Sequence, residues 1–88
     1  MSEAKRLSVI IPVLNERGSL PSVLEEIPKD LALEIIVVDG HSTDGTPEIV
    51  RELGYTVIPQ EGQGYGLAVQ TGLKAATGEL VTFMDGDG

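Results

Sequence analysis

The sequence predicts an α/β domain in which a parallel β-sheet is covered by helices on both faces. Three observations support this fold class. Short runs of β-branched residues alternate with segments of helical periodicity, the runs are apolar enough for burial on both sides, and turn-forming residues separate the segments. A regular alternation of strands and helices is typical of parallel sheets, because each helix carries the chain back to the same edge.

Four segments have the composition of strands. The first stops at a proline, and the second holds four consecutive β-branched residues before it ends on an acid, as expected for a strand buried on both faces. The third and fourth are shorter. The predicted strands are Leu7–Pro12, Leu33–Asp39, Tyr55–Pro59 and Leu80–Met84.

Three segments between these strands are predicted as helices. Ser19 is a candidate N-cap for the first helix, and Asp44 or Thr46 for the second. Gly54 is expected to close the second helix, since glycine adopts the left-handed conformation that often ends helices. The predicted helices are Leu20–Ile27, a segment from about Pro47 to Leu53, and Leu67–Ala76.

Right-handed crossovers predict the strand order 3-2-1-4, which is a three-layer, Rossmann-like arrangement with two helices on one face and one on the other. Ligands bind such sheets outside the carboxyl ends of the strands, here in the crevice between the first and fourth strands. Three polar clusters follow predicted carboxyl ends, at residues 12–16, 39–46 and 85–88. We expect them to meet along one edge. The face with a single helix is expected to expose apolar sheet, through which the chain could self-associate.

Length and charge narrow the possible functions. The 88 residues form at most one domain, at residues 7–88, preceded by a polar tail at 1–6. A net charge of −8 argues against nucleic-acid binding and against attraction to anionic membranes. Without cysteine there are neither disulfides nor thiolate metal sites. No apolar run approaches the roughly 20 residues that span a bilayer, and we expect a cytoplasmic chain.

Asp85 and Asp87 follow the last predicted strand. Residues at i and i+2 project to the same side of an extended chain, so the two carboxylates can converge on one point. A hard divalent cation between them would offset their repulsion and could bridge them to phosphates. The alternative is that Asp-Gly-Asp-Gly is turn chemistry, which these residues equally favour.

Other polar residues at the same predicted edge have two interpretations each. Asp39 could accept a hydrogen bond from a nucleobase or could brace the loop that follows it. Asn15 and Glu16 could bind ribose or base, or could satisfy loop backbone. Asp44 is interpreted first as a loop or capping residue, and His41 as a loop residue near the ligand.

The glycines of the GQGYG segment do not form a dinucleotide fingerprint, because such a fingerprint follows the first strand and these glycines follow the third. Gly62, Gly64 and Gly66 are predicted to allow a tight entry into the helix at Leu67, near a phosphate or as a plain turn.

Four motifs, in order and spacing, resemble the N-terminal half of a family 2 glycosyltransferase domain of the GT-A fold. They are VIIPVLNE, IIVVDGHSTDGT, GQGYGLAVQTGLKAATGE and VTFMDGDG. The subgroup they resemble is the dolichol- or polyprenol-phosphate mannosyl- and glucosyltransferases. The resemblance implies that Pro12, Leu14 and Glu16 line a nucleotide site, that Asp39 contacts the base, and that Asp85 also serves the nucleotide.

The same resemblance makes Asp85 and Asp87 the D-x-D motif, with Asp87 as the more direct ligand of Mg²⁺ or Mn²⁺. It implies an inverting-type enzyme that moves a hexose from GDP-mannose or UDP-glucose to an acceptor such as polyprenyl phosphate. The full-length enzyme would then work at the cytoplasmic face of a membrane. The chain matches only the donor half, so no catalytic base is assigned and we expect no sugar transfer from these residues alone.

Two departures from the family pattern stand out. Gly40 and His41 replace the usual Asp-Gly, and Gln63 stands where a lysine is frequent. The alternative function is a non-catalytic nucleotide- or metal-binding module, or a minimal folding unit. Nucleotidyl transfer to a sugar phosphate is a weaker alternative, because VLNERGS is a poor match for the glycine-rich, basic loop such enzymes use.

Overall fold

The fold is that of a computed structural model, which describes residues 7–27 and 33–84. Strands and helices alternate along the chain as predicted. In order they are β1 (Leu7–Val13), α1 (Leu20–Glu25), β2 (Leu33–Asp39), α2 (Thr46–Glu52), β3 (Thr56–Pro59), α3 (Tyr65–Ala75) and β4 (Leu80–Phe83). The predicted tail at residues 1–6 and the cluster at 85–88 lie outside the described residues, so the predicted domain limits stay a prediction.

The four strands form one parallel sheet in the order β3-β2-β1-β4, which confirms the predicted topology. β1 is central and pairs with β2 along its whole length, from Leu7 opposite Leu33 to Val13 opposite Asp39. On its other side it pairs with β4 only from Leu7 to Ile10. The carboxyl ends of β1, β2 and β3 therefore lie at one edge of the sheet.

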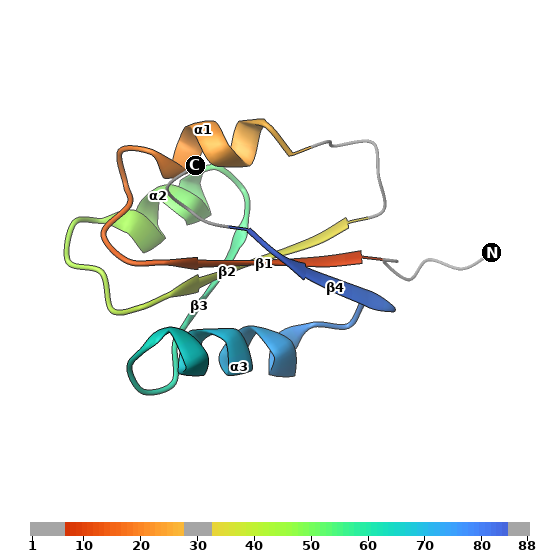
Figure 1. Ribbon diagram of the computed structural model, residues 1–88. Helices are drawn as coiled ribbons and strands as arrows, with labels where there is room; N and C mark the ends of the chain where they lie inside the picture. Colours follow the sequence, from red (N-terminus) through yellow and green to blue (C-terminus); the bar gives the residue numbers. More distant parts are fainter. Residues whose placement is uncertain (1–6, 28–32, 85–88) are drawn as a thin grey trace.

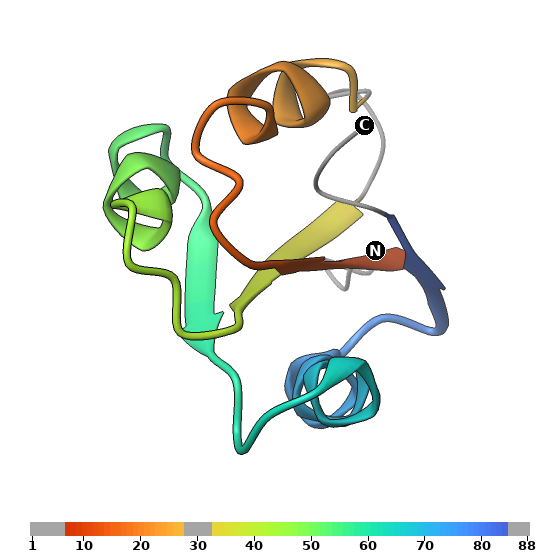
Figure 2. The ribbon, with the colours of Figure 1, turned by 60° about the vertical axis from the view of Figure 1, so that its left-hand side comes forward.

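Helices cover both faces of this sheet, as Figures 1 and 2 show. Side chains alternate along each strand, so β1 sends Ile11 to the face covered by α1 and α2 and Ile10 to the face covered by α3. Both side chains are fully buried. The larger core lies under α1 and α2, and a smaller one under α3, as predicted for a strand order of 3-2-1-4.

Some element boundaries differ from the prediction. α3 begins at Tyr65, two residues before the predicted Leu67. Of the three glycines in the GQGYG segment, Gly62 and Gly64 have positive φ, whereas Gly66 is already part of the helix. Ser19 occupies the N-cap position of α1 but makes no side-chain capping hydrogen bond. The backbone N–H groups of Ser19 and Leu20 instead donate to the carbonyl of Glu16.

A polar network at the opposite edge of the sheet was not predicted. The fully buried Ser8 hydroxyl donates to Glu34 Oε1 at 2.7 Å and accepts from the Gly78 N–H at 2.8 Å. Thr77 N–H donates to the same Glu34 oxygen at 2.8 Å. These bonds join the α3–β4 connection to the amino ends of β1 and β2, so they hold the edge strand on the sheet.

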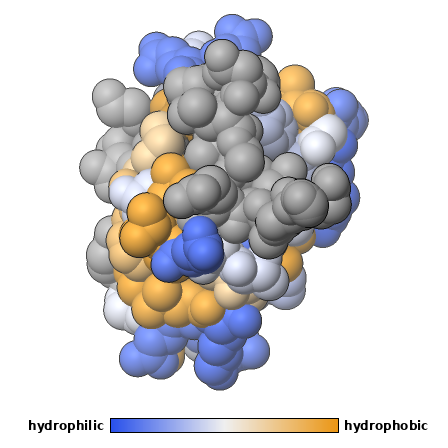
Figure 3. All heavy atoms as spheres, turned by 90° about the vertical axis from the view of Figure 1, so that its right-hand side faces the viewer, coloured by the Kyte–Doolittle hydropathy of each residue, from blue (hydrophilic) through white to orange (hydrophobic). Residues whose placement is uncertain are grey.

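Apolar side chains reach the surface along β4. Leu80 is 66% exposed, and Val81 and Phe83 are also exposed. Figure 3 shows this apolar surface between polar side chains. No helix within residues 7–27 and 33–84 has both the length and the apolarity needed to cross a membrane.

We expect Gly72→Ala to destabilise the fold. A methyl group there would collide with Cγ2 of Ile10, which is fully buried and β-branched and so has little room to move. Overpacking of this kind costs about 1–3 kcal/mol in the free energy of unfolding, measurable by urea denaturation. Gly66→Ala in the same helix meets open space and is the matched control, expected to change stability by at most about +1 kcal/mol. Equal effects of the two substitutions would contradict this packing.

Candidate functional site

The loops that follow β1 and β2 are joined by hydrogen bonds. Asn15 N–H donates to Ser42 Oγ at 2.8 Å, and Thr43 N–H donates to Asn15 Oδ1 at 2.8 Å. Asn15 has a φ of 52°, a left-handed conformation that Asn tolerates better than most residues. Asn15 was predicted either to bind ribose or base or to satisfy loop backbone groups, and the structure contains the second of these roles.

Asp44 is the centre of the same junction. Its Oδ1 accepts from the backbone N–H of Thr46 at 3.0 Å and also from the Thr46 hydroxyl, while Oδ2 accepts from Arg17 N–H at 3.2 Å. Thr46 Oγ1 in turn accepts from Glu16 N–H at 3.1 Å. Asp44 therefore has the loop and capping role predicted for it, although Gly45 occupies the formal N-cap position.

The Thr46 hydroxyl lowers the pKa of the Asp44 carboxyl below its ordinary value of 3.8, and the N–H groups of Arg17 and Thr46 act in the same direction. A folded-state pKa below the unfolded one means that ionised Asp44 stabilises the fold above the unfolded pKa. This contribution is lost as the pH falls through the folded pKa.

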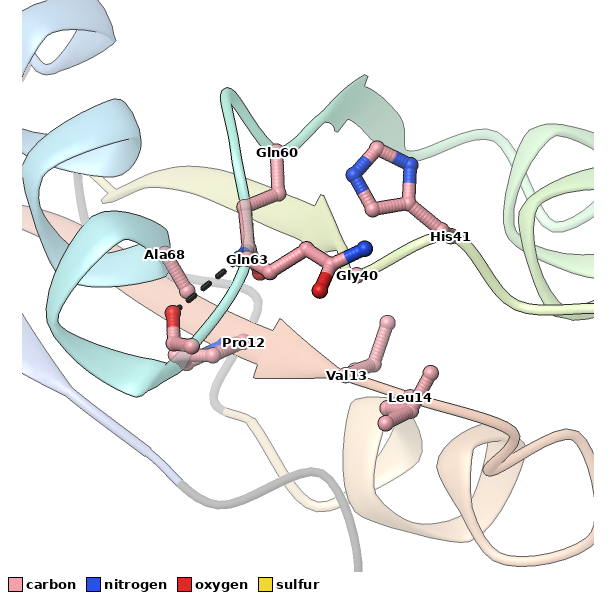
Figure 4. Close-up of a pocket in the computed structure, with 9 residues that line it drawn as sticks. Pro12, Val13, Leu14, Gly40, His41, Gln60, Gln63 and Ala68 are labelled. Atoms are coloured by element: carbon pink, nitrogen blue, oxygen red, sulfur yellow. Dashed lines mark hydrogen bonds between the residues drawn. The ribbon is translucent and has the colours of Figure 1, made fainter.

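A pocket of about 530 Å³ lies beside this junction, on the carboxyl-end edge of the sheet. Its lining comes from the end of β1, from the residues after β2, and from the β3–α3 loop with α3. The lining residues are Pro12, Val13, Leu14, Gly40, His41, Gln60, Gln63, Gly64 and Ala68. In Figure 4 the β1 residues stand on one side of the pocket, opposite His41 and Gln60.

The predicted residues Pro12 and Leu14 thus line a pocket at the predicted edge. The pocket extends toward β3, however, whereas the predicted crevice lies between the first and fourth strands. The predicted residues after β4 fall outside the described part of the chain. Among the described residues, the space next to β3 is the part of the site that the sequence did not predict.

Asp39 lies at the end of β2, next to the pocket residue Gly40. Its side chain is buried, and Oδ2 accepts from Ser42 N–H at 3.0 Å, which is the predicted bracing of the loop. Its other oxygen, Oδ1, is buried without a hydrogen-bond partner among residues 7–27 and 33–84. A buried carboxylate oxygen without a donor is unfavourable, so Asp39 keeps unused hydrogen-bond accepting capacity next to the pocket residue Gly40.

Glu16 folds back onto its own loop. Its Oε1 accepts from the Leu14 N–H at 3.3 Å, and its backbone carbonyl accepts from the N–H groups of Ser19 and Leu20. The structure therefore contains the loop-bracing interaction predicted as one alternative for Glu16. Contact of this side chain with a nucleotide stays a prediction.

The glycine-rich loop at residues 61–64 forms the side of the pocket next to β3. Gln60 is buried, and its Nε2 donates to the carbonyls of Gly62 at 3.2 Å and Gly64 at 3.0 Å. Gly62 and Gly64 have φ values of 78° and 97°, so both need the freedom of glycine. Gln60 was not predicted as a site residue, because a glutamine after a strand carries no local signal for a buried role.

Gly40 allows Gln60 to sit this close to β2. A Cβ atom at Gly40 would lie 3.1 Å from Gln60 Oε1 and 3.2 Å from the carbonyl oxygen of Val13. The Gly40 N–H donates to that same carbonyl at 2.8 Å, which extends the β1–β2 pairing beyond the strands. The absence of a side chain at Gly40 therefore leaves the space that the buried Gln60 occupies.

The residues expected to bind metal, Asp85 and Asp87, lie outside the described residues. Within residues 7–27 and 33–84, no three His, Asp or Glu side chains gather into a metal-binding group. The predicted donors are carboxylate oxygens, which are the ligands that Mg²⁺ and Mn²⁺ prefer. β4 runs parallel to β1 toward this edge, and Met84 N–H donates to the carbonyl of Ile10 at 3.0 Å.

The fold and the site define a class of protein. A parallel sheet of order 3-2-1-4, with helices on both faces and a pocket at the carboxyl ends of its strands, is the arrangement of GT-A glycosyltransferase domains. The family model described as glycosyl transferase family 2 matches residues 8–88. The chain belongs to glycosyl transferase family 2.

Solved structures of two transferases are similar to this chain. A mannosyltransferase from Pyrobaculum calidifontis, in complex with GDP-Man and Mn²⁺, is 37% identical with a TM-score of 0.80 over 96% of this chain and 28% of that one. Glucosyl-3-phosphoglycerate synthase from Mycobacterium tuberculosis, in complex with Mn²⁺, UDP and glucosyl-3-phosphoglycerate, is 32% identical with a TM-score of 0.85, over 93% of this chain and 33% of that one.

A dolichyl-phosphate hexose transferase of Haloferax volcanii is 42% identical over 83 residues, which are 92% of this chain and 36% of that protein. The chain spans about a third of the length of such relatives. Family membership and fold are thus established for this chain.

We expect Asp44→Asn to lower the stability of the fold near neutral pH, because the amide loses the charge that strengthens the bonds to Thr46 and Arg17. The difference from the wild type should shrink as the pH falls below the ordinary value of 3.8 and through the lower folded-state pKa, where Asp44 becomes protonated in the wild type. Urea denaturation of both proteins at several pH values measures this difference. A gap that stays constant down to the lowest pH would show that the ionised carboxylate is not the source of the stability.

Proposed function

We propose that this chain is the part of a hexosyltransferase that binds the nucleotide-sugar donor. The observation that carries the proposal is the pocket at the carboxyl ends of the strands, beside which a buried Asp39 oxygen has no hydrogen-bond donor among the described residues. An imino or amino group of a nucleobase is a donor of the required kind, because an ionised carboxylate only accepts.

The lining of the pocket supports its use for the nucleoside and not for the phosphates. Among the residues that the structure describes, no lysine or arginine lines the pocket. The side formed by Pro12, Val13 and Leu14 offers apolar surface to a flat ring. The proposed nucleotide-binding residues are Pro12, Leu14, Glu16, Asp39 and Asp85.

The diphosphate then needs a cation, since the chain carries a net charge of −8. We assign this role to Mg²⁺ or Mn²⁺ held by Asp85 and Asp87. Such an ion, when bound, offsets the charge that develops on the departing nucleoside diphosphate. Two similar structures contain Mn²⁺ together with a nucleotide, which supports the proposal.

The donor is proposed to be of the GDP-mannose or UDP-glucose type, and the acceptor of the full-length enzyme a polyprenyl phosphate, with inversion at the sugar. The similar proteins support these donors and this acceptor. Two of the solved structures contain GDP-Man or UDP, and one relative is a dolichyl-phosphate hexose transferase. A location at the cytoplasmic face of a membrane would bring such an enzyme to a lipid acceptor. Sugar transfer by these 88 residues alone is not expected.

The alternative of a non-catalytic binding or folding module makes a different prediction. A pure folding unit would bind no nucleotide, and a plain nucleotide module would bind without regard to metal. Titration with and without metal therefore separates the three possibilities.

We expect UDP or GDP to bind in isothermal titration calorimetry, and to bind more tightly with Mn²⁺. Asp39→Asn should weaken nucleotide binding by about tenfold or more with and without metal, because a hydrogen bond to a charged group is lost. Asp87→Asn should abolish only the gain from Mn²⁺. Glu52→Gln removes the same charge at an exposed position of α2 that does not line the pocket, and is the control. Absence of binding to the wild type would refute the proposed function.

We also propose that the chain self-associates through exposed apolar sheet, as predicted from the sequence. The large exposed apolar side chains of the described sheet lie on β4, whose outer edge has no strand partner among the described residues. Lysine on an edge strand opposes edge-to-edge pairing. Light scattering at micromolar concentrations should therefore show a larger species for the wild type and a monomer for Leu80→Lys. Leu53→Lys, at a comparably apolar exposed position outside the sheet, should behave as the wild type. A monomeric wild type would refute this interface.

A further inference from the structure

His41 adopts an unusual backbone conformation at the rim of the pocket. Its φ is 71°, in the left-handed region that residues with a Cβ atom rarely occupy. Glycine would occupy this position without strain. A strained residue at a ligand pocket points to a role for its side chain that offsets the unfavourable backbone conformation.

The side chain reaches across to the glycine-rich loop. His41 Nε2 lies 2.9 Å from the carbonyl oxygen of Gly62. A carbonyl oxygen only accepts, so Nε2 carries the hydrogen of this bond. Gln60 Nε2 donates to the same oxygen at 3.2 Å, so that both acceptor positions of the Gly62 carbonyl are used.

These two bonds hold the loop from different elements. Gln60 ties it to the end of β3, and His41 ties it to the end of β2, 21 positions away in sequence. The loop itself contains two glycines with positive φ, which in the unfolded chain have more conformational freedom than other residues. The bond from His41 therefore restricts a segment that has little intrinsic preference for its conformation.

The loop and the end of β1 form opposite sides of the pocket. Figure 4 shows the His41 ring above Gly40, with Val13 and Leu14 on the other side. The position of the loop thus determines the width of the pocket. A binding site that is already formed avoids the cost of ordering a loop when the ligand arrives.

We propose that His41 is a positioning residue for the nucleoside: its bond to Gly62 keeps the loop in place and the pocket open to a nucleobase. The inference rests on the proposed function, because it assigns the pocket to the nucleoside of the donor. The proposal also predicts that His41 strengthens nucleotide binding by the same factor with and without phosphates and metal. The reason is that its bond to Gly62 belongs to the lining of the pocket assigned to the nucleoside.

The substitution His41→Gly separates this role from a purely structural one. Glycine relieves the strained backbone, so the stability of the fold should be unchanged or higher. Nucleotide binding should nevertheless become about three- to tenfold weaker, the effect of one lost hydrogen bond. A structural residue would shift stability and binding in the same direction.

His41→Gln is the rescue variant, because its amide nitrogen can donate to the Gly62 carbonyl as Nε2 does. It should keep wild-type affinity even if its backbone strain lowers the stability of the fold. Binding is measured by NMR titration with UMP, and with UDP in the presence and absence of Mn²⁺. Hydrogen exchange of the amides at residues 61–64 reports on the loop directly.

We expect His41→Gly to bind UMP and UDP more weakly by the same factor, and its amides at residues 61–64 to exchange hydrogen faster. His41→Gln should behave as the wild type in both measurements. If the wild type binds nucleotides and His41→Gly binds them equally well, the inference is overturned and the proposed function stands. Weaker binding by both variants would also overturn it, since the bond would then not be the cause. If the wild type binds no nucleotide, the proposed function itself fails.

Discussion

The parallel pairing of β1 with β2 is the interaction on which the rest of the molecule depends. It runs in register from Leu7 opposite Leu33 to Val13 opposite Asp39, and the bond from Gly40 to Val13 extends it. Because both strands end at the same edge, the loops after them lie side by side and become joined through Asn15 and Asp44. A shift of one residue in this register would exchange the two faces of the strand and separate those loops.

The two edges of the sheet use polar groups differently. At the amino edge, Ser8 and Glu34 bond to each other and to the α3–β4 connection, so this network serves stability. At the carboxyl edge, Asp39 keeps one buried oxygen without a partner among the described residues, and His41 is held in a left-handed conformation. Unpaired polar atoms and strained backbone are unfavourable for folding, and their concentration beside one pocket agrees with a ligand site there.

Membership of glycosyl transferase family 2 gives this pocket a chemical context, and the described residues show how this chain builds it. Gly40 and His41 follow Asp39 at this edge, and both have structural partners. Gly40 leaves space for the buried Gln60, whose amide reaches the glycine-rich loop, and His41 reaches the same loop from the other side. Gly40, His41 and Gln60 thus form one set of contacts around the β3–α3 loop.

The sequence by itself determined the alternation of strands and helices, the strand order and the edge that carries the pocket. These follow from local apolar runs, from turn residues such as Gly54, and from the handedness of crossovers. Only the tertiary structure decided the roles of Gln60 and His41 and the Ser8–Glu34 network. The hydrogen bonds of His41 and Ser8 join residues that are 21 to 70 positions apart in the sequence, and those of Gln60 depend on how the β3–α3 loop returns to the sheet. A hydrogen bond between distant residues leaves no periodicity in the sequence, because its geometry exists only once β1, β2 and α3 have packed together.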